Sequence, residues 1–428
     1  MAGRVITVSI LGCGGRGGET YGTIMNGQKD KWKINAILEP NPVRREKYGT
    51  LFGVPSENRF EKEDDFFAAK RSDAILICTM DRIHVRQALK ALRWKYDILL
   101  EKPISDDVEE LNDLYQAYRS SGCKIMVCHV LRYTGMIHKI SELLEQGAIG
   151  ELVSIDHTEN VCFWHQAHSF VRGNWHKSQE TTPMILAKCC HDFDLLQFFA
   201  NSPCHSLSSF GNLRYFKKEN MPEGAAKRCL DCRYCRSCEY SAPRIYMNLW
   251  DEEGRKQNVW PINAVTDAYP QTEEAIMKAL REGPYGKCVY QCDNDVVDNQ
   301  TVIMRFENGV TATLKMEGFT AHGGRDIRFF GTKGEILLAE FDGIIRLKTF
   351  LGEERIWKIS ELGYTPYGHG GGDVGIVNRF YDVVTGLDQA PDTSLEKSLE
   401  SHYMALAAEN SRLHGGALEL LENYRRHD

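Results

Sequence analysis

The stretch Val5-Ile6-Thr7-Val8-Ser9-Ile10-Leu11-Gly12-Cys13-Gly14-Gly15-Arg16-Gly17 decides the fold of the first part of the chain. Val5–Leu11 is rich in apolar and β-branched residues, which is typical of a buried strand. Glycines follow at once with the spacing G-x-G-x-x-G. They permit a tight turn and let backbone N–H groups approach a pyrophosphate at the start of a helix. We therefore expect a strand, a turn and a helix, with a dinucleotide bound at Gly12, Gly14, Gly15, Arg16 and Gly17.

Further apolar runs alternate with helical patterns up to about residue 130. The runs are short and bounded by polar or turn residues, as in a parallel sheet that is covered on both faces. They lie at Lys33–Leu38, Ala74–Thr79, Asp97–Leu100 and Lys124–Val130, and a helical pattern lies at Val108–Tyr118. Residues 1–130 are therefore predicted to form a Rossmann domain, a doubly wound parallel α/β sheet.

The sequence changes character after residue 130. Apolar and polar residues alternate along several segments separated by turn signals, which indicates a mostly antiparallel open sheet. These segments are Leu152–Val161, Gln300–Phe306, Val310–Met316, Asp326–Phe330 and Ile344–Phe350, and helical patterns follow at Val374–Thr385 and Ser394–Leu413. We expect a second α/β domain over residues 131–428. A cysteine-bearing insertion at about 217–292 looks too polar to bury a core of its own.

Composition excludes several classes of protein. The chain has 428 residues and a formal charge of −7, so it lacks the basic surplus that a nucleic-acid partner requires. No stretch reaches the ~20 apolar residues of a membrane helix. The N-terminus runs straight into the glycine turn without the features of a signal peptide. The sequence therefore indicates a cytoplasmic protein that binds neither nucleic acid nor membrane.

Glu39 ends the second predicted strand, where a carboxylate accepts hydrogen bonds from the hydroxyls of an adenosine ribose. Its charge repels a 2′-phosphate, so NAD is favoured over NADP. Arg44 and Arg45 follow closely in the sequence and leave NADP open.

Three motifs together resemble the family of glucose-fructose oxidoreductase, inositol dehydrogenase and MocA (Gfo/Idh/MocA). They are Glu101-Lys102-Pro103 after the fourth predicted strand, the segment Ala74–His84, and the pair Arg132-Tyr133. The resemblance implies a Rossmann domain, a C-terminal α/β domain and NAD-dependent oxidation of a sugar or cyclitol. It places beside the cofactor Thr79, His84, Glu101 and Lys102. Asp81 stands where the family has Asn.

Oxidation of a secondary alcohol requires a hydride acceptor, a base for the hydroxyl proton, and positive charge where the alkoxide develops. The resemblance gives Lys102 the role of polarising the hydroxyl. His191 is the candidate base, because an imidazole has a pKa near neutrality and because Leu186–Leu196 is similar to the family's D-x-x-x-H-x-x-D helix. Ala187 occupies the first Asp position and Lys188 follows. Either another carboxylate orients the imidazole, or Lys188 anchors the substrate. Helical spacing is expected to bring to one face Lys188, His191 and Leu195.

Two further segments are candidate substrate-binding loops. Phe163–Trp175 is dense in aromatic and polar side chains, which suit the apolar faces and hydroxyl edges of a sugar. Its candidate contacts are His165, His168, Arg172 and Trp175. The alternative is an aromatic subunit contact. The glycine-rich segment Tyr367–Asp373 adds His369, although Asp373 is also a candidate helix N-cap.

Four cysteines recur at Cys229, Cys232, Cys235 and Cys238 with the spacing C-x2-C-x2-C-x2-C. Thiolates at this density favour a structural zinc ion, with an iron–sulfur cluster, disulfides or free thiols as alternatives. The gaps are cramped for one tetrahedral ion, so Cys204, Cys288 or Cys292 is a candidate replacement ligand. The metal would hold the polar insertion in place without a role in hydride transfer.

Three functions remain open. The leading one is an NAD-dependent oxidoreductase acting on a secondary hydroxyl of a sugar, glycoside or cyclitol. The second, implied by relatives in the same broad family, is a redox-neutral NAD-dependent glycoside hydrolase that works by oxidation, elimination, hydration and reduction. The third is a regulator that binds NAD and a sugar without turnover. One face of the second sheet needs a cover, so we expect a homodimer or homotetramer.

Overall fold

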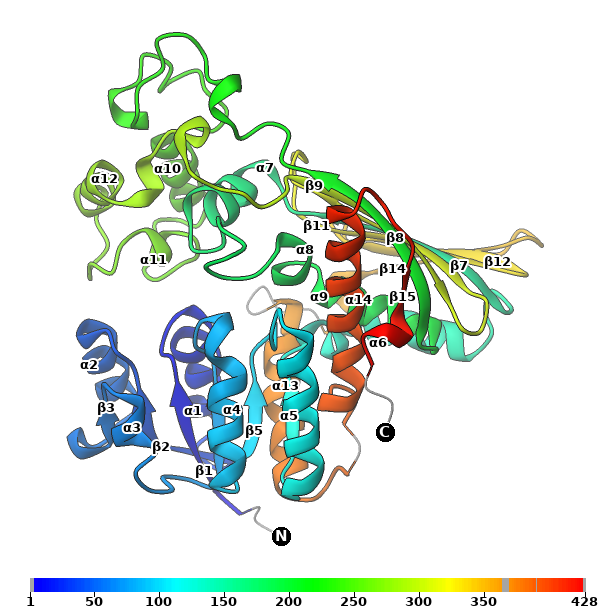
Figure 1. The fold of residues 1–428 in the computed structure, drawn as a ribbon, viewed down its shortest axis with the longest axis horizontal. Coiled ribbons are helices and arrows are strands. Elements are labelled where there is room, and N and C mark those ends of the chain that lie inside the picture. The colour runs from blue at the N-terminus through cyan, green and yellow to red at the C-terminus, as the bar shows by residue number, and fades with distance from the viewer. Residues whose placement is uncertain (1–3, 364–368, 390, 426–428) are drawn as a thin grey trace.

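The structure is a computed structural model that describes residues 4–363, 369–389 and 391–425. It contains two sheets, with the parallel sheet below and the second sheet above and to the side in Figure 1. All neighbours in the first sheet are parallel, in the order β3-β2-β1-β4-β5-β6. Its strands are β1 Ile6–Leu11, β2 Trp32–Leu38, β3 Arg59–Phe60, β4 Ala74–Ile77, β5 Asp97–Leu100 and β6 Ile125–Val127. The predicted doubly wound parallel sheet is confirmed.

Helices cover both faces of this sheet because its strands are apolar on both sides. One apolar cluster joins Ile6, Val8 and Ile10 of β1 to Tyr21 and Phe380. The opposite cluster packs β4 and β5 against the helices that follow them. The helices around the sheet are α1 Thr23–Gly27, α2 Pro42–Leu51, α3 Glu63–Phe66, α4 His84–Arg93, α5 Val108–Ser121 and α13 Gly372–Val384. The helix α13 comes from the C-terminal part of the chain and returns to the first sheet.

The second sheet has the order β14-β13-β12-β11-β7-β10-β9-β8-β15. Its neighbours are antiparallel except for β7 and β10, so the predicted mostly antiparallel open sheet is confirmed. The strands are β7 Leu152–Asn160, β8 Cys204–Asn212, β9 Asn299–Phe306, β10 Thr311–Glu317, β11 Gly324–Gly331, β12 Gly334–Ala339, β13 Ile344–Thr349, β14 Glu354–Lys358 and β15 Glu419–Leu420.

One face of the second sheet packs against helices, which lie between the two sheets in Figure 1. These helices are α6 Gly135–Glu145, α8 Met184–Ala187, α9 Cys190–Ala200 and α14 Leu395–Leu413. The strand β9 alternates buried and exposed side chains, as a sheet with one covered face requires. Over the described ranges, no helix is long and apolar enough to cross a membrane.

The insertion between β8 and β9 forms a separate helical layer, at the upper left of Figure 1. It contains α10 Ala242–Glu252, α11 Ile262–Val265 and α12 Glu273–Glu282, and the short helix α7 Phe163–His165 lies beside it. Its buried apolar cluster includes Ile245, Tyr246, Trp250, Ile276 and Leu280. The expectation that the insertion is too polar for its own core is therefore wrong, because amphipathic helices supply one.

Candidate active site

The glycine turn follows β1 and leads into the helical turn Gly15–Gly22. Gly12 has φ of +82°, and a Cβ on it would lie 2.5 Å from the carbonyl oxygen of Cys78. A Cβ on Gly17 would overlap the carbonyl oxygen of Gly12. By contrast, a Cβ on Gly15 would meet open space. Side chains are therefore excluded where strand and helix pack, and the outer side of the turn leaves room for a pyrophosphate.

Glu39 lies directly beside the glycine turn. Its carboxylate accepts hydrogen bonds from the backbone N–H groups of Cys13 at 2.7 Å and Asn41 at 2.9 Å, and the residue is 6% exposed. The second strand therefore delivers a fixed negative charge to the place where the adenosine ribose of a dinucleotide lies in this fold. This arrangement fits NAD.

Arg16 and Glu101, both predicted to lie at the cofactor, bind each other. The guanidinium of Arg16 donates to Glu101 at 2.7 Å and to Asp373 at 2.6 Å, and it also contacts the hydroxyl of Tyr21. Burial opposes ionisation of Glu101, yet the charges of Arg16 and Lys102 keep the pKa of Glu101 below its usual value. This network ties the glycine turn to β5 and to the start of α13.

Asp373 does not cap a helix, so that alternative reading is wrong. It is the second residue of α13, and Gly371 occupies the N-cap position. Its carboxylate pairs with Arg16 and, at 3.1 Å, with Nδ1 of His369. The preceding Tyr367 and Gly368 lie outside the described residues.

Thr79 and His84 connect the two loops at the carboxyl edge of the first sheet. The Thr79 hydroxyl donates to Oε1 of Gln87 at 2.8 Å. The ring nitrogens of His84 lie 2.8 Å from the carbonyl oxygen of Pro103 and 3.0 Å from that of Thr79. Both ring nitrogens thus contact backbone, and His84 holds the loop after β4 against the loop after β5.

Lys102 and His191 come together above the carboxyl end of β5. The ammonium of Lys102 donates to the carbonyl oxygen of Ala187 at 3.0 Å, at the end of α8, while His191 lies in the first turn of α9. Burial lowers the pKa of His191 well below its usual value, and the nearby positive charge of Lys102 lowers it further. The buried Nδ1 of His191 has no hydrogen-bond partner within the described part of the chain. A cation and a neutral imidazole therefore share this site.

Two more histidines surround His191. The ring of His129 lies 5.6 Å and the ring of His369 6.2 Å from the ring of His191, measured between centroids. Burial lowers the pKa values of both neighbours. The predicted site residue His369 is therefore brought to His191, although the two are far apart in the sequence.

The helix expected through Lys188, His191 and Leu195 is interrupted, so that expectation is wrong. The helix α8 ends at Ala187 and α9 begins at Cys190. Lys188 lies between them, and its ammonium pairs with the buried carboxylate of Glu159 on β7 at 3.0 Å. This ion pair directs the side chain of Lys188 toward β7, so Lys188 does not share a helix face with His191.

The predicted substrate loop packs partly on the insertion and partly on the loop after β4. His165 stacks beside Trp164 and lies 4.8 Å from Trp260 between ring centroids. Burial lowers the pKa of His165 well below its usual value, and the charges of Lys188 and Lys102 add to this effect. His165 is therefore near the two lysines of the site. Trp175 donates from Nε1 to Asp81 at 3.1 Å and so contacts the loop after β4.

His168 and Arg172 are held by residues of the insertion, and their role as substrate contacts stays a prediction. His168 is 3% exposed, bonds to the hydroxyl of Tyr246 at 2.9 Å and stacks on Tyr285. Burial lowers the pKa of His168 to about 3. Arg172 donates to the carbonyl oxygens of Lys287 at 2.8 Å and Tyr240 at 2.6 Å. Both side chains hold the insertion together.

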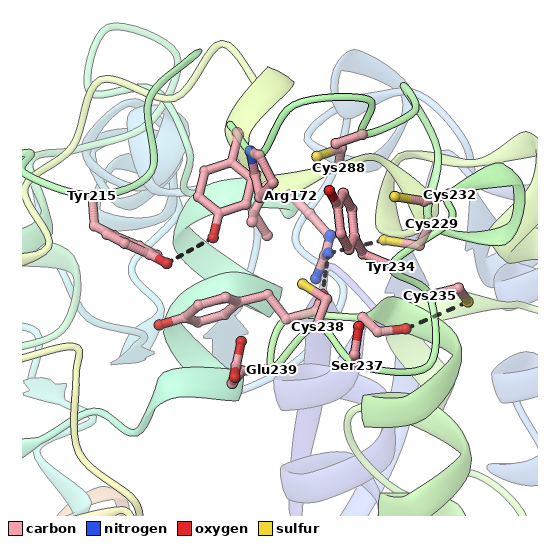
Figure 2. A pocket seen from close by; sticks show the side chains of 16 residues that line it. Arg172, Tyr215, Cys229, Cys232, Tyr234, Cys235, Ser237, Cys238, Glu239 and Cys288 are labelled. Atoms are coloured by element: carbon pink, nitrogen blue, oxygen red, sulfur yellow. Dashed lines mark hydrogen bonds between the residues drawn. The ribbon is translucent and has the colours of Figure 1, made fainter. Parts of the chain in front are cut away.

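The cysteine segment lines a pocket in the insertion with Cys288, far along the sequence from the four-cysteine motif (Figure 2). Arg172 donates to the sulfur of Cys229 at 3.5 Å, and the sulfur of Cys235 contacts the hydroxyl of Ser241 at 3.7 Å. Within the described ranges, no three His, Cys, Asp or Glu side chains are placed to hold a metal ion. The cysteines are free thiols. The predicted zinc site is therefore not supported.

Comparison with protein families matches both parts of the chain. Residues 6–129 match the NAD-binding Rossmann fold of the Gfo/Idh/MocA oxidoreductase family, and residues 141–364 match the C-terminal alpha/beta domain of the same family. The chain belongs to the Gfo/Idh/MocA oxidoreductase family. It is an NAD-dependent oxidoreductase.

Among curated relatives of this oxidoreductase, the putative oxidoreductase YteT of Bacillus subtilis is 24% identical over 83% of this chain and 86% of its own. Inositol 2-dehydrogenase of Corynebacterium glutamicum is 26% identical over 46% of this chain and 55% of its own. A 2,7-anhydro-N-acetylneuraminate hydratase of Escherichia coli is 24% identical over 35% of this chain and 42% of its own.

Solved structures share the fold of this oxidoreductase. Scyllo-inositol dehydrogenase of Lactobacillus casei with NAD(H) and scyllo-inositol has a TM-score of 0.66 at 17% identity, over 98% of this chain and 100% of its own. An Agrobacterium radiobacter oxidoreductase in complex with NAD+, L-tartaric acid and magnesium has a TM-score of 0.68 at 17% identity, over 98% and 99%.

Sequence reasoning missed a buried charge network in this Gfo/Idh/MocA protein. Arg325 on β11 pairs with Glu159 at 2.9 Å and with Asp192 at 2.8 Å. His157 on β7 lies 2.9 Å from Asp192. The network fixes α9 on the second sheet directly beside His191. One signal of this network was present in the sequence: Glu159 is an acidic residue within a strand of alternating apolar and polar residues.

Proposed function

We propose that this oxidoreductase oxidises a secondary hydroxyl of a sugar, glycoside or cyclitol, with Lys102 polarising the hydroxyl and His191 accepting its proton. The observation that carries the proposal is the meeting of the Lys102 ammonium with a buried imidazole of lowered pKa. A neutral imidazole accepts a proton, and an adjacent cation stabilises the alkoxide that forms.

The residues at the edge of the first sheet fit NAD, which supplies the hydride acceptor when bound. The glycine turn would hold the pyrophosphate, and Glu39, beside that turn, would accept hydrogen bonds from the ribose hydroxyls. Lys102 draws the substrate oxygen toward its ammonium, and the hydroxyl proton moves from that oxygen to the imidazole of His191. Lys188, which pairs with Glu159, and His165, whose pKa is lowered by burial and by the charges of Lys188 and Lys102, would bind the other hydroxyls of the substrate.

A second candidate function is a redox-neutral NAD-dependent glycoside hydrolase. Two observations favour it: relatives bear the name of a hydratase that acts on an anhydro sugar, and His165 supplies a second imidazole of lowered pKa near Lys102 and Lys188. An elimination step needs a base in addition to the one that takes the hydroxyl proton, and His165 meets that requirement.

One experiment separates these functions. The protein is incubated with NAD and a panel of inositols, reducing sugars and aryl glycosides, while NADH and released aglycone are followed. Accumulating NADH identifies the dehydrogenase, and aglycone release without NADH identifies the hydrolase. Lys102→Met and His191→Gln are each expected to lower kcat/KM by about 10²-fold or more. The control is Lys315→Met, because this lysine is exposed on β10. Turnover by both site variants at the control's rate would refute the assignment.

The open face of the second sheet supports assembly as a homodimer or homotetramer. Its outward residues include apolar side chains that a second copy would cover, namely Val153, Phe210, Ile303 and Ile356. The cysteine segment takes no part in the proposed chemistry, since its described side chains do not fit a metal ion.

A further inference from the structure

Two arginines follow Glu39, beside the place where the adenosine ribose lies in this fold, and one of them is held by its own domain. Arg45 donates to the carbonyl oxygens of Glu39 at 2.6 Å and Pro40 at 3.0 Å, and it pairs with Glu61 at 3.2 Å. Its donors are therefore directed at the loop after β2. Arg44 is the remaining cation that could meet a 2′-phosphate.

Arg44 reaches the glycine turn. It lies in the first turn of α2, and a Cβ placed on Gly14 would lie 3.9 Å from its Nη1. A guanidinium at this position binds the 2′-phosphate in NADP-dependent Rossmann domains. The residue type and its position alone would thus predict that NADP is accepted.

The insertion supplies a carboxylate to this arginine. Oδ1 of Asp267 accepts from Nε of Arg44 at 3.2 Å and from Nη2 at 3.1 Å. One helical turn further along α2, Lys47 donates to Oδ1 of Asn258 at 3.1 Å, so the insertion contacts the same face of α2 twice. Figure 1 shows the insertion above the edge of the parallel sheet that carries α2.

The charges around the ribose position now favour a neutral hydroxyl. Arg45 is paired with Glu61, which leaves the two negative charges of Glu39 and Asp267 against the one positive charge of Arg44. A 2′-phosphate brings further negative charge and would have to compete with Asp267 for the Nε and Nη2 donors. A ribose hydroxyl meets no such barrier, because it donates to Glu39.

We propose that Asp267 of the insertion sets the preference for NAD over NADP by occupying the Nε and Nη2 donors with which Arg44 would bind a 2′-phosphate. Asp267 is a positioning residue that acts through Arg44. The proposal concerns the nucleotide end of the cleft and does not depend on which sugar reacts.

The test measures the binding of 2′,5′-ADP and of ADP to the whole protein by titration calorimetry. Asp267→Asn keeps the shape of the side chain and removes its charge. We expect the variant to bind 2′,5′-ADP about tenfold more tightly, with less than about a twofold change for ADP. The ratio of kcat/KM for NADP and NAD should rise in parallel once a substrate is known.

Two further variants make the result decisive. Asp251→Asn removes a carboxylate of the same insertion that pairs with Arg255 instead of Arg44, and should change neither affinity. In the Arg44→Gln background, Asp267→Asn should have no further effect on 2′,5′-ADP. Unchanged 2′,5′-ADP affinity in Asp267→Asn, or the same gain without Arg44, would overturn the proposal. If the protein discriminates between the two nucleotides as expected but oxidises no sugar, that result would count only against the proposed function.

Discussion

At the scale of the residue, the proposed chemistry depends on keeping His191 neutral. Burial lowers the pKa of its imidazole first, and the positive charges of Lys102 and Arg325 lower it further. A base with a lowered pKa stays deprotonated at neutral pH, although it holds its proton less strongly once it has accepted one.

This electrostatic account predicts the effect of removing one charge. In Lys102→Met, the pKa of His191 should rise toward its usual value, because a nearby cation no longer disfavours the imidazolium. The measurement is an NMR titration of the histidine side chains. His168 serves as the internal reference, since its lowered pKa arises from burial and Arg172 and does not involve Lys102. An unchanged or lower pKa of His191 would contradict the account.

Single residues also show what sequence can predict about a site. Lys102 and His191 were found through motifs of fixed spacing after a strand and within a helix. His168 and Arg172 were chosen by residue type alone, and their partners Tyr246 and Lys287 lie far along the chain. No local pattern predicts that this histidine bonds to a tyrosine so far along the chain.

At the scale of the element, α9 carries His191 and is fixed at both sides. Asp192 binds Arg325 of the second sheet, while Asp194 binds Arg132 after β6 at 2.7 Å and 2.8 Å. The side chains of Asp194 and Arg132 are almost fully buried. The helix is therefore an anchor between the two sheets.

Breaking this anchor should be costly. Asp194→Ala leaves the Arg132 guanidinium buried without its partner, so we expect a loss of about 3–5 kcal/mol in the free energy of unfolding. The comparison is Asp251→Ala, which removes an exposed pair and should cost less than about 1 kcal/mol. Urea denaturation measures both. Equal losses in the two variants would show that the buried pair does not anchor the helix.

Some helices and strands are easier to predict from the sequence than others. The strands of the parallel sheet are apolar on both faces, so their runs stand out. The strand β8 reads Cys204-His205-Ser206-Leu207-Ser208-Ser209-Phe210-Gly211-Asn212 and was missed, because serines fill buried and half-buried positions on both of its faces. The break between α8 and α9 was also missed, since Lys188 turns toward Glu159 on a strand about thirty residues earlier.

At the scale of the whole molecule, the site exists only where the two sheets and the insertion meet. Lys102 comes from the first sheet, His191 from a helix fixed to the second, and His165 from the segment that packs on Trp260 of the insertion. Composition and periodicity identified each part separately. The contact between insertion and α2 rests on single polar pairs, such as Arg44 with Asp267, that no periodicity encodes.

The folded protein buries several neutral histidines. We therefore expect it to lose stability in mild acid. Burial lowers the pKa of His168 and of His402 to about 3 each. The unfolded chain binds a proton at each of these residues below about pH 6.5, and the folded chain does not until about pH 3. The free energy of unfolding should therefore fall by up to about 1.4 kcal/mol per pH unit for each histidine as the pH drops below about 6.5.

Urea denaturation at a series of pH values between about 8 and 5 measures this slope. Lowered pKa values are also found for His129, His165, His191 and His369. These residues therefore also decrease the free energy of unfolding as the pH falls. The double variant His168→Gln/His402→Gln should be less stable at pH 8 but show a shallower fall, because two of the titrating groups are gone. Stability that stays constant down to pH 5, or an unchanged slope in the double variant, would mean that these imidazoles reach water or a counter-charge in the folded protein.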